Sequence, residues 1–267
     1  MIRLREMIEL QKEHVEQYRK IAASFVEKEI STIPEVLGVL LTGSTARGDA
    51  RKGPLGLMTD ITIVLEPNTS INLIERFGPS VEPADFPFHA INRQDATFAL
   101  ELTDIDRLRD IKKQAESAIF AKQESLIIFD RTGQLEKWKD TAFNLSDDEI
   151  KQRSLMYYRW FEYMSNEYHF EKWVYRKAWI QLTHNLNVAC ECFCSFLFCI
   201  NGGYVPRRDW IVYLTYELPE KPIDYEQLIH SMYQSLTTEA AITNRAAAIR
   251  KANQWMISYC KTKGWMS

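Results

Sequence analysis

The sequence lacks a basic excess and a long hydrophobic run, and each absence excludes a class of protein. Its 267 residues carry 33 Lys and Arg against 36 Asp and Glu, a formal net charge of -3. Proteins dedicated to DNA or RNA usually have a surplus of positive charge, so we expect no nucleic-acid partner. The longest apolar run, Val188 to Ile200, is interrupted by Glu191 and is too short to cross a bilayer. We therefore expect no membrane association.

A spaced disulfide framework is also missing. The sequence has five cysteines, and four of them crowd between Cys190 and Cys199. Zinc sites generally combine a Cys-x-x-Cys knuckle with a second distant pair, which the sequence does not contain. We expect these cysteines to be buried as small apolar residues. The first residues mix acids and bases without the apolar core of a signal peptide, so we expect a cytoplasmic protein with reduced thiols.

The hydrophobic patterning changes character near Asn144. Before that residue, short apolar runs alternate with helical segments, whereas helical patterning dominates after Ser146, which begins a cap followed by three acids. The composition, 46% hydrophobic and 26% charged, is that of a globular protein. We predict an α/β (α+β) N-terminal domain with a mixed sheet over residues 1–144 and an all-α helical bundle over residues 145–267.

The expected elements follow from periodicity and breakers. In the first domain we predict strands at 36–41, 58–66, 86–92, 96–103 and 125–129, and helices at 2–30, 68–77 and 104–123. In the second domain we predict two long helices between 146 and 200, broken near 170–173, and further helices at 207–217, 225–236 and 238–262.

One stretch in the first domain carries residues that can do chemistry. An apolar strand ends at Leu41 and is followed by Thr42, Gly43 and Ser44, and Asp60 opens the returning strand. Glycine permits a sharp turn and a close approach to a ligand. Ser44 is a good N-cap for a short helix over residues 45–49, and amides with a hydroxyl at a helix start suit phosphate. An aspartate oxygen at Asp60 suits a magnesium ion beside that phosphate.

A second acid lies inside a predicted strand. Between residues 96 and 103 the side chains alternate, so that Thr97, Ala99 and Glu101 share one face and the apolar Phe98 and Leu100 lie on the other. Glu101 therefore points away from the apolar side. It is our candidate for an acid that acts together with Asp60.

The ordered set resembles the signature of the nucleotidyltransferase superfamily, which includes aminoglycoside and lincosamide nucleotidyltransferases. That signature is Gly-Ser, a short helix often ending in Arg-Gly, and Asp-x-Asp on the next strand. The residues of this sequence that match it are Gly43, Ser44, Arg47, Gly48 and Asp60. Two features depart from the pattern: Thr62 stands where the second acid of Asp-x-Asp would be, and the loop after Gly48 is longer than usual.

The resemblance implies transfer of a nucleoside monophosphate, AMP from ATP in the simplest case, to a hydroxyl group of a small molecule such as an antibiotic. It implies that Asp60 and Glu101 are catalytic and hold Mg²⁺. It also implies that Gly43, Ser44, Arg47 and Thr62 bind the nucleotide. Such transfer depends on positioning and on neutralising charge, normally by two metal ions held between several carboxylates.

Thr62 leaves the activity open, because a hydroxyl cannot replace the charge of a carboxylate. Asp49 and Glu66 are the other acids considered for this role. The alternative hypothesis is a degenerate, non-catalytic nucleotide-binding or regulatory protein with the same fold, and a third is the toxin of a toxin–antitoxin pair. The second domain contains four basic residues of interest, Arg176, Lys177, Arg207 and Arg208. They either bind the phosphates of the nucleotide or are ordinary surface charges. The acceptor, the preferred nucleotide and the oligomeric state do not follow from the sequence.

Overall fold

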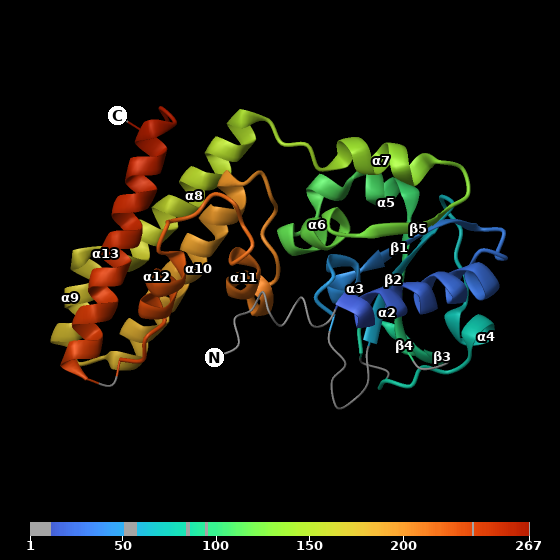
Figure 1. Cartoon of the computed structure of the whole chain (residues 1–267), viewed down its shortest axis with the longest axis horizontal. Helices are drawn as coiled ribbons and strands as arrows, with labels where there is room; N and C mark the ends of the chain where they lie inside the picture. The colour runs from blue at the N-terminus through green and yellow to red at the C-terminus, as the bar shows by residue number, and fades with distance from the viewer. Residues whose placement is uncertain (1–11, 51–57, 84–85, 94–95, 237, 267) are drawn as a thin grey trace. The chain divides into compact units, whose positions relative to one another are not determined.

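The computed structural model describes residues 12–50, 58–83, 86–93, 96–236 and 238–266. The chain divides into two compact units, Met1–Asn144 and Leu145–Ser267. Figure 1 shows the elements of both, and each unit is described below by itself. The first combines a β-sheet with helices, and the second is helical, which confirms the predicted fold class.

The first unit is built on a five-stranded mixed sheet with the strand order β3-β4-β2-β1-β5. The central pair, β1 and β2, is antiparallel, as are the β1–β5 and β3–β4 pairs, whereas β2 and β4 run parallel. The strands are β1 (Val36–Thr42), β2 (Met58–Leu65), β3 (His89–Arg93), β4 (Ala96–Asp104) and β5 (Leu126–Asp130). The strand predicted at 86–92 therefore begins three residues too early.

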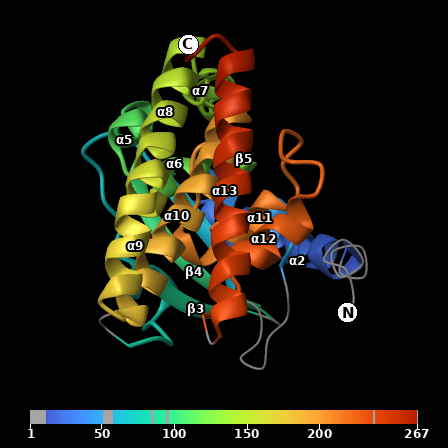
Figure 2. The same cartoon turned by 90° about the vertical axis from the view of Figure 1, so that its left-hand side faces the viewer.

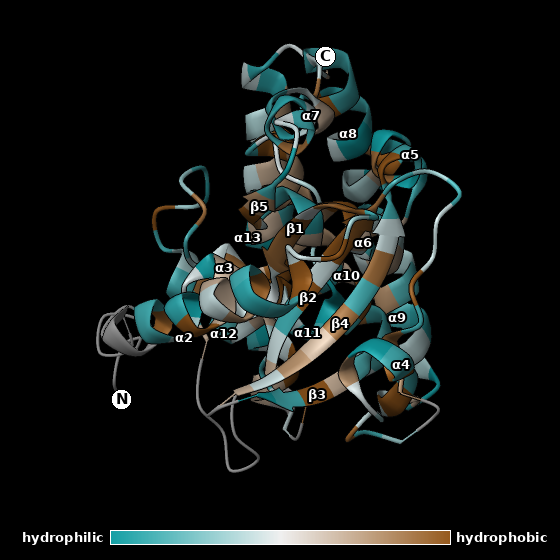
Figure 3. Cartoon of the chain, turned by 90° about the vertical axis from the view of Figure 1, so that its right-hand side faces the viewer, coloured by the Kyte–Doolittle hydropathy of each residue, from teal (hydrophilic) through white to brown (hydrophobic). Residues whose placement is uncertain are grey.

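One face of the sheet packs on the N-terminal helix. Helix α2 (Lys12–Phe25) continues as a π-helical turn, η1 (Val26–Ile30). Its apolar side chains join those of alternate strand residues in one core, as in the stacked rings of Phe25 and Phe98. The brown central strands of Figure 3 mark this apolar centre of the sheet. Part of the predicted helix over 2–30, residues 2–11, lies outside the described residues.

Two other predicted helices of this unit are wrong in extent. The helix expected over 68–77 covers only α4 (Leu73–Phe77), because the Asn72 side chain caps it by accepting hydrogen bonds from Ile74 N and Glu75 N. The single helix expected over 104–123 is three pieces. These are α5 (Ile105–Arg109), the 3₁₀ turn η2 (Ile111–Lys113) and α6 (Glu116–Gln123), followed after β5 by α7 (Gln134–Ala142). The break occurs where Ala115 adopts extended backbone angles.

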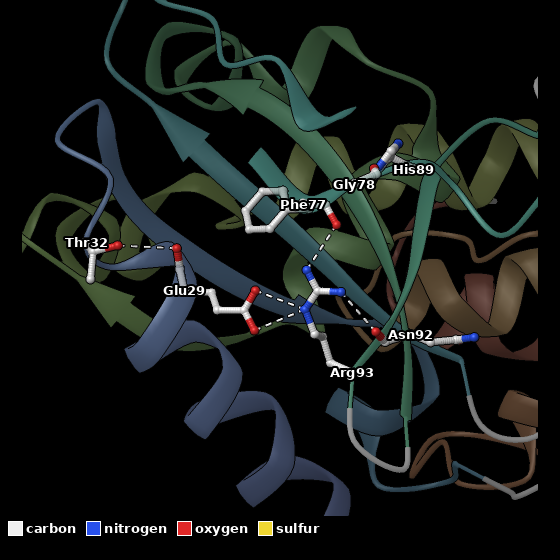
Figure 4. A network of polar contacts seen from close by, with 7 residues as sticks. All are labelled: Glu29, Thr32, Phe77, Gly78, His89, Asn92 and Arg93. Carbon is white, nitrogen blue, oxygen red and sulfur yellow. Dashed lines mark hydrogen bonds and ion pairs between the residues drawn. The ribbon is translucent and has the colours of Figure 1, made fainter. Parts of the chain in front are cut away.

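Arg93 holds the edge of the sheet to the turn after α2. Its Nε lies 3.1 and 3.0 Å from the two carboxylate oxygens of Glu29. One terminal nitrogen donates to the Phe77 carbonyl at 3.0 Å and the other to the Asn92 carbonyl at 3.0 Å. Figure 4 shows this guanidinium joining η1, the end of α4 and β3, so that one side chain ties three elements together.

The second unit consists of helices that pack along one another. The 22-residue α10 runs beside α8, and α13 packs on α12 and α8 (Figure 2). The helices are α8 (Asp147–Ser165), α9 (Glu167–Tyr175), α10 (Trp179–Ile200), α11 (Arg208–Thr215), α12 (Tyr225–Met232) and α13 (Glu239–Thr262). The break predicted near 170–173 is wrong. The chain instead breaks at Asn166, which caps α9, and after Tyr175, where Lys177 has a φ of 51°.

The cysteines of this unit lie in its apolar interior, as predicted. Cys190, Cys194 and Cys199 are fully buried thiols, whereas Cys192 is half-buried. Burial raises the pKa of the Cys190 thiol to about 12, so that it stays protonated at neutral pH. None of the helices in the described part of the chain is long and apolar enough to cross a membrane.

Candidate functional site

The turn after β1 begins the candidate site. Gly43 has a φ of +67°, a left-handed conformation that glycine adopts without steric cost, so the chain passes directly from the strand into α3 (Gly43–Arg47). The helix therefore starts two residues earlier than predicted. Its N-cap is Thr42, which makes no side-chain capping bond, so the predicted capping role of Ser44 is wrong. Ser44 instead lies in the first turn of α3.

Asp60 lies directly against this turn. Thr42 and Asp60 are partners in the β1–β2 register, and a Cβ atom placed on Gly43 would come within 2.0 Å of Asp60 Oδ2. Only a residue without a side chain fits there. The structure thus brings the glycine turn and the first acid together, although they are 17 positions apart in the sequence.

Helix α3 is held in place by Arg19 of α2. The Arg19 guanidinium donates to the carbonyl of Thr45 at 3.1 Å and to that of Ala46 at 2.6 Å. Carbonyl groups at the end of a helix lack intrahelical partners and attract positive charge. This contact anchors the short helix to α2.

Three of the predicted site residues lie on the face of the sheet that α2 does not cover. Asp60 and Thr62 alternate with the core residues of β2, and in the parallel register Thr62 is the partner of Glu101 while Asp60 is the partner of Ala99. From strand spacing and rise, Glu101 is a diagonal neighbour roughly 8 Å from Asp60 between backbones. The structure thus places Asp60, Thr62 and Glu101 on one surface.

Lys122 of α6 covers part of that surface. Its ammonium nitrogen lies 2.6 Å from Thr62 Oγ1 and 2.5 Å from Glu101 Oε2. Thr62 Oγ1 in turn donates to Glu101 Oε2 at 2.8 Å. The Lys122 side chain is 8% exposed and that of Glu101 is 43% exposed. Glu101, Thr62 and Lys122 therefore each contact the other two.

The pKa of Glu101 reflects this environment. Burial raises the pKa of the carboxyl group, but the charge and hydrogen bond of Lys122, with the hydrogen bond from Thr62, outweigh it, so the pKa is lowered below its ordinary value. Glu101 is therefore ionised at neutral pH. A lowered pKa also makes it a weaker proton acceptor.

The remaining acids named for this site lie elsewhere. Asp49 forms an ion pair with Arg47 at 3.3 Å, and both side chains are largely buried. Glu66 follows the far end of β2, six residue steps beyond Asp60, which corresponds to about 20 Å along the strand. Neither takes the place of an acid at Thr62. Arg47, predicted to bind the nucleotide, contacts Asp49 in this structure.

These residues do not fit a pair of magnesium ions. Two ions need several carboxylates close together, and across the described ranges no group of three or more His, Cys, Asp or Glu side chains is placed to hold a metal ion. Thr62 contributes no charge, and one oxygen of Glu101 already binds an ammonium group. We therefore derive no step of a reaction through a metal ion.

Lys122 is the residue that the sequence analysis did not select. The sequence nevertheless contained a pattern that indicates its burial. Lys122 lies three residues after the buried Ile119, on the same face of a short helix. A lysine on a buried helical face needs a partner of opposite charge. The sequence did not identify that partner.

Three of the basic residues named in the second unit make local contacts. Arg207 pairs with Asp209 at 2.6 Å, and Arg208 pairs with Glu191 at 3.3 Å. The Arg176 guanidinium lies 5.8 Å from the centre of the Trp173 ring. These contacts are what ordinary surface charges make.

Comparison with known proteins gives a family match and similarity to solved structures. Residues 112–211, less than half of the chain, match a family described as a domain of unknown function (DUF4037). The chain is also similar to the crystal structure of a nucleotidyltransferase-like protein from Exiguobacterium sibiricum 255-15. The two share 13% identity with a TM-score of 0.43, over 91% of this chain and 75% of that one. No curated protein matches the chain.

Proposed function

We propose that the chain is a nucleotidyltransferase that binds a nucleoside triphosphate, most simply ATP, and transfers its nucleoside monophosphate to a hydroxyl group of a small molecule. The observation that carries the proposal is the approach of Asp60 to Gly43, because it places a carboxylate beside backbone that can accommodate a phosphate. An aminoglycoside or lincosamide as the acceptor is suggested by the resemblance of the sequence motif alone.

The transfer would be an in-line displacement at the α-phosphorus. The acceptor oxygen forms a bond to that phosphorus, the bond to the bridging oxygen breaks, and pyrophosphate leaves with the negative charge. The proton of the acceptor hydroxyl goes to a carboxylate. We assign this role to Asp60, because Lys122 and Thr62 already hold Glu101 Oε2 and its pKa is lowered. Glu101 would then orient groups at the site without accepting a proton.

A second candidate function is nucleotide binding without turnover. The contact that favours it is the ion pair of Lys122 with Glu101, which neutralises the second acid of the site. A protein of this kind would bind the triphosphate at the same turn and regulate another process. The two functions share the binding site and differ in whether pyrophosphate is released.

One experiment separates the two functions. The protein is incubated with each labelled nucleoside triphosphate, with and without magnesium, and with a panel of hydroxylated small molecules that includes aminoglycosides and lincosamides. Nucleotide binding is measured in parallel by equilibrium dialysis. The variants are Asp60→Asn and, as the matched control, Asp110→Asn, since Asp110 forms an exposed ion pair with Lys113 outside the sheet.

Pyrophosphate release that is lost in Asp60→Asn and kept in Asp110→Asn supports transfer. Binding without release under every condition supports the second function. If no nucleoside triphosphate binds to the folded protein at millimolar concentration, both proposals are wrong.

A further inference from the structure

We infer that the ammonium group of Lys122 is the resident cation of this site, held where a divalent ion would otherwise join Glu101 to the side chain at position 62. The inference rests on the proposed function only in taking this face of the sheet as the nucleotide site. It follows that the cation beside Glu101 is a side chain of the protein itself and, unlike a bound metal ion, does not dissociate.

The contacts of Lys122 match those of a bound cation. Its ammonium nitrogen has a carboxylate oxygen at 2.5 Å and a hydroxyl oxygen at 2.6 Å. Both ligands belong to neighbouring strands and are register partners, so β2 and β4 hold them side by side. An ammonium group has three N–H donors, and these contacts use two of them.

Thr62 is suited to an ammonium group and not to a second metal ion. Its fully buried hydroxyl accepts from Lys122 and donates to Glu101, so its hydrogen-bonding capacity is used in both directions. One lysine and one glutamate give a neutral pair. An aspartate at position 62 would leave an excess negative charge there, which a divalent ion could neutralise. Thr62 and Lys122 are thus complementary in charge.

A divalent ion at Glu101 would have to compete with Lys122. The ammonium group is tethered to α6, and its side chain is almost completely buried, so it cannot withdraw into solvent without moving the helix. Like charges about 4 Å apart repel strongly even at an effective dielectric constant of about 20. The charge of Lys122 therefore opposes the binding of a metal ion at Glu101.

The test measures Mn²⁺ binding to the full-length protein by electron paramagnetic resonance, without nucleotide. The variants are Lys122→Met, Thr62→Asp and the combination Thr62→Asp with Lys122→Met. Lys113→Met is the matched control, because Lys113 is an exposed lysine whose ion pair with Asp110 lies outside the sheet. Melting curves establish that each variant is folded, and Lys122→Gln replaces Lys122→Met if the latter is not.

The wild type and Lys113→Met are expected to bind Mn²⁺ weakly and equally. Removing the charge in Lys122→Met is expected to raise the affinity by at least about tenfold, a small part of the repulsion between such close charges. The double variant is expected to bind more tightly still, whereas Thr62→Asp alone gains less than the double variant because Lys122 still offsets one of the two acids.

Equal Mn²⁺ affinity in the wild type and in folded Lys122 variants would overturn the inference, as would tight binding to the wild type that is lost in Glu101→Gln. Binding of ATP in the presence of a chelator is measured separately. Failure of every nucleoside triphosphate to bind, with or without magnesium, contradicts the proposed function and leaves the result with Mn²⁺ intact, so the two failures are distinguishable.

Discussion

Replacing Gly43 by alanine is the most informative perturbation of the site. The new Cβ would lie 2.0 Å from Asp60 Oδ2 and 3.1 Å from its carboxyl carbon, and the residue would keep a φ of +67°. A left-handed conformation costs a residue other than glycine about 1–2 kcal/mol. Forcing atoms into an occupied space adds about 1–3 kcal/mol. We therefore expect Gly43→Ala to lower the free energy of unfolding of the first unit by about 2–5 kcal/mol.

The two contributions can be separated by two controls. Gly133 has a nearly identical φ of +70° but nothing within 4 Å of a built Cβ, so Gly133→Ala tests the backbone strain alone, at about 1–2 kcal/mol. In an Asp60→Ala background the carboxyl group is gone, and only the Asp60 Cβ remains, at an ordinary 3.5 Å. The cost of Gly43→Ala should then fall to that of Gly133→Ala.

Hydrogen exchange of peptides from β1 and β2 in increasing urea reports the stability of the first unit without interference from the second. Titration with a fluorescent ATP analogue reports binding, and we expect Gly43→Ala to weaken it by at least about tenfold. An unchanged cost of Gly43→Ala in the Asp60→Ala background would refute the proposed contact, because a double-mutant cycle must then show no coupling.

Three further predictions concern other contacts. The pKa of Glu101 is lowered on folding, so its contribution to stability is complete above its ordinary pKa of 4.5 and is lost as the pH falls through the lower folded value. Urea unfolding between pH 3 and 6 should therefore show a shallower pH dependence in Glu101→Gln. Arg93→Met should cost about 1 kcal/mol, since its pair with Glu29 is partly exposed, and should speed hydrogen exchange in β3; an unchanged β3 would contradict the role of Arg93. Ser146→Ala removes the capping box of α8, and should lower the stability of the second unit by about 1 kcal/mol while Ser146→Asp retains it.

Several features of the fold follow from local sequence. The alternation in β4 was sufficient to place Glu101 on the face opposite Phe98, because successive residues of a strand point to opposite sides. The acids after Ser146 were sufficient to begin α8, because a capping box involves only four consecutive residues. The boundaries were less predictable where a single side chain decided them, as when Asn72 shortened α4.

The state of the site depends on contacts that no local pattern contains. Lys122 reaches Thr62 across 60 residues of sequence and Glu101 across 21. These contacts form only because β2 and β4 pair in parallel and α6 carries Lys122 to the two register partners. By itself the sequence determined the strands, the glycine turn and the direction in which the two acids point, since each of these depends on neighbours along the chain. Only the tertiary structure decided that the second acid is paired with a lysine, because helix α6 must first dock on the sheet.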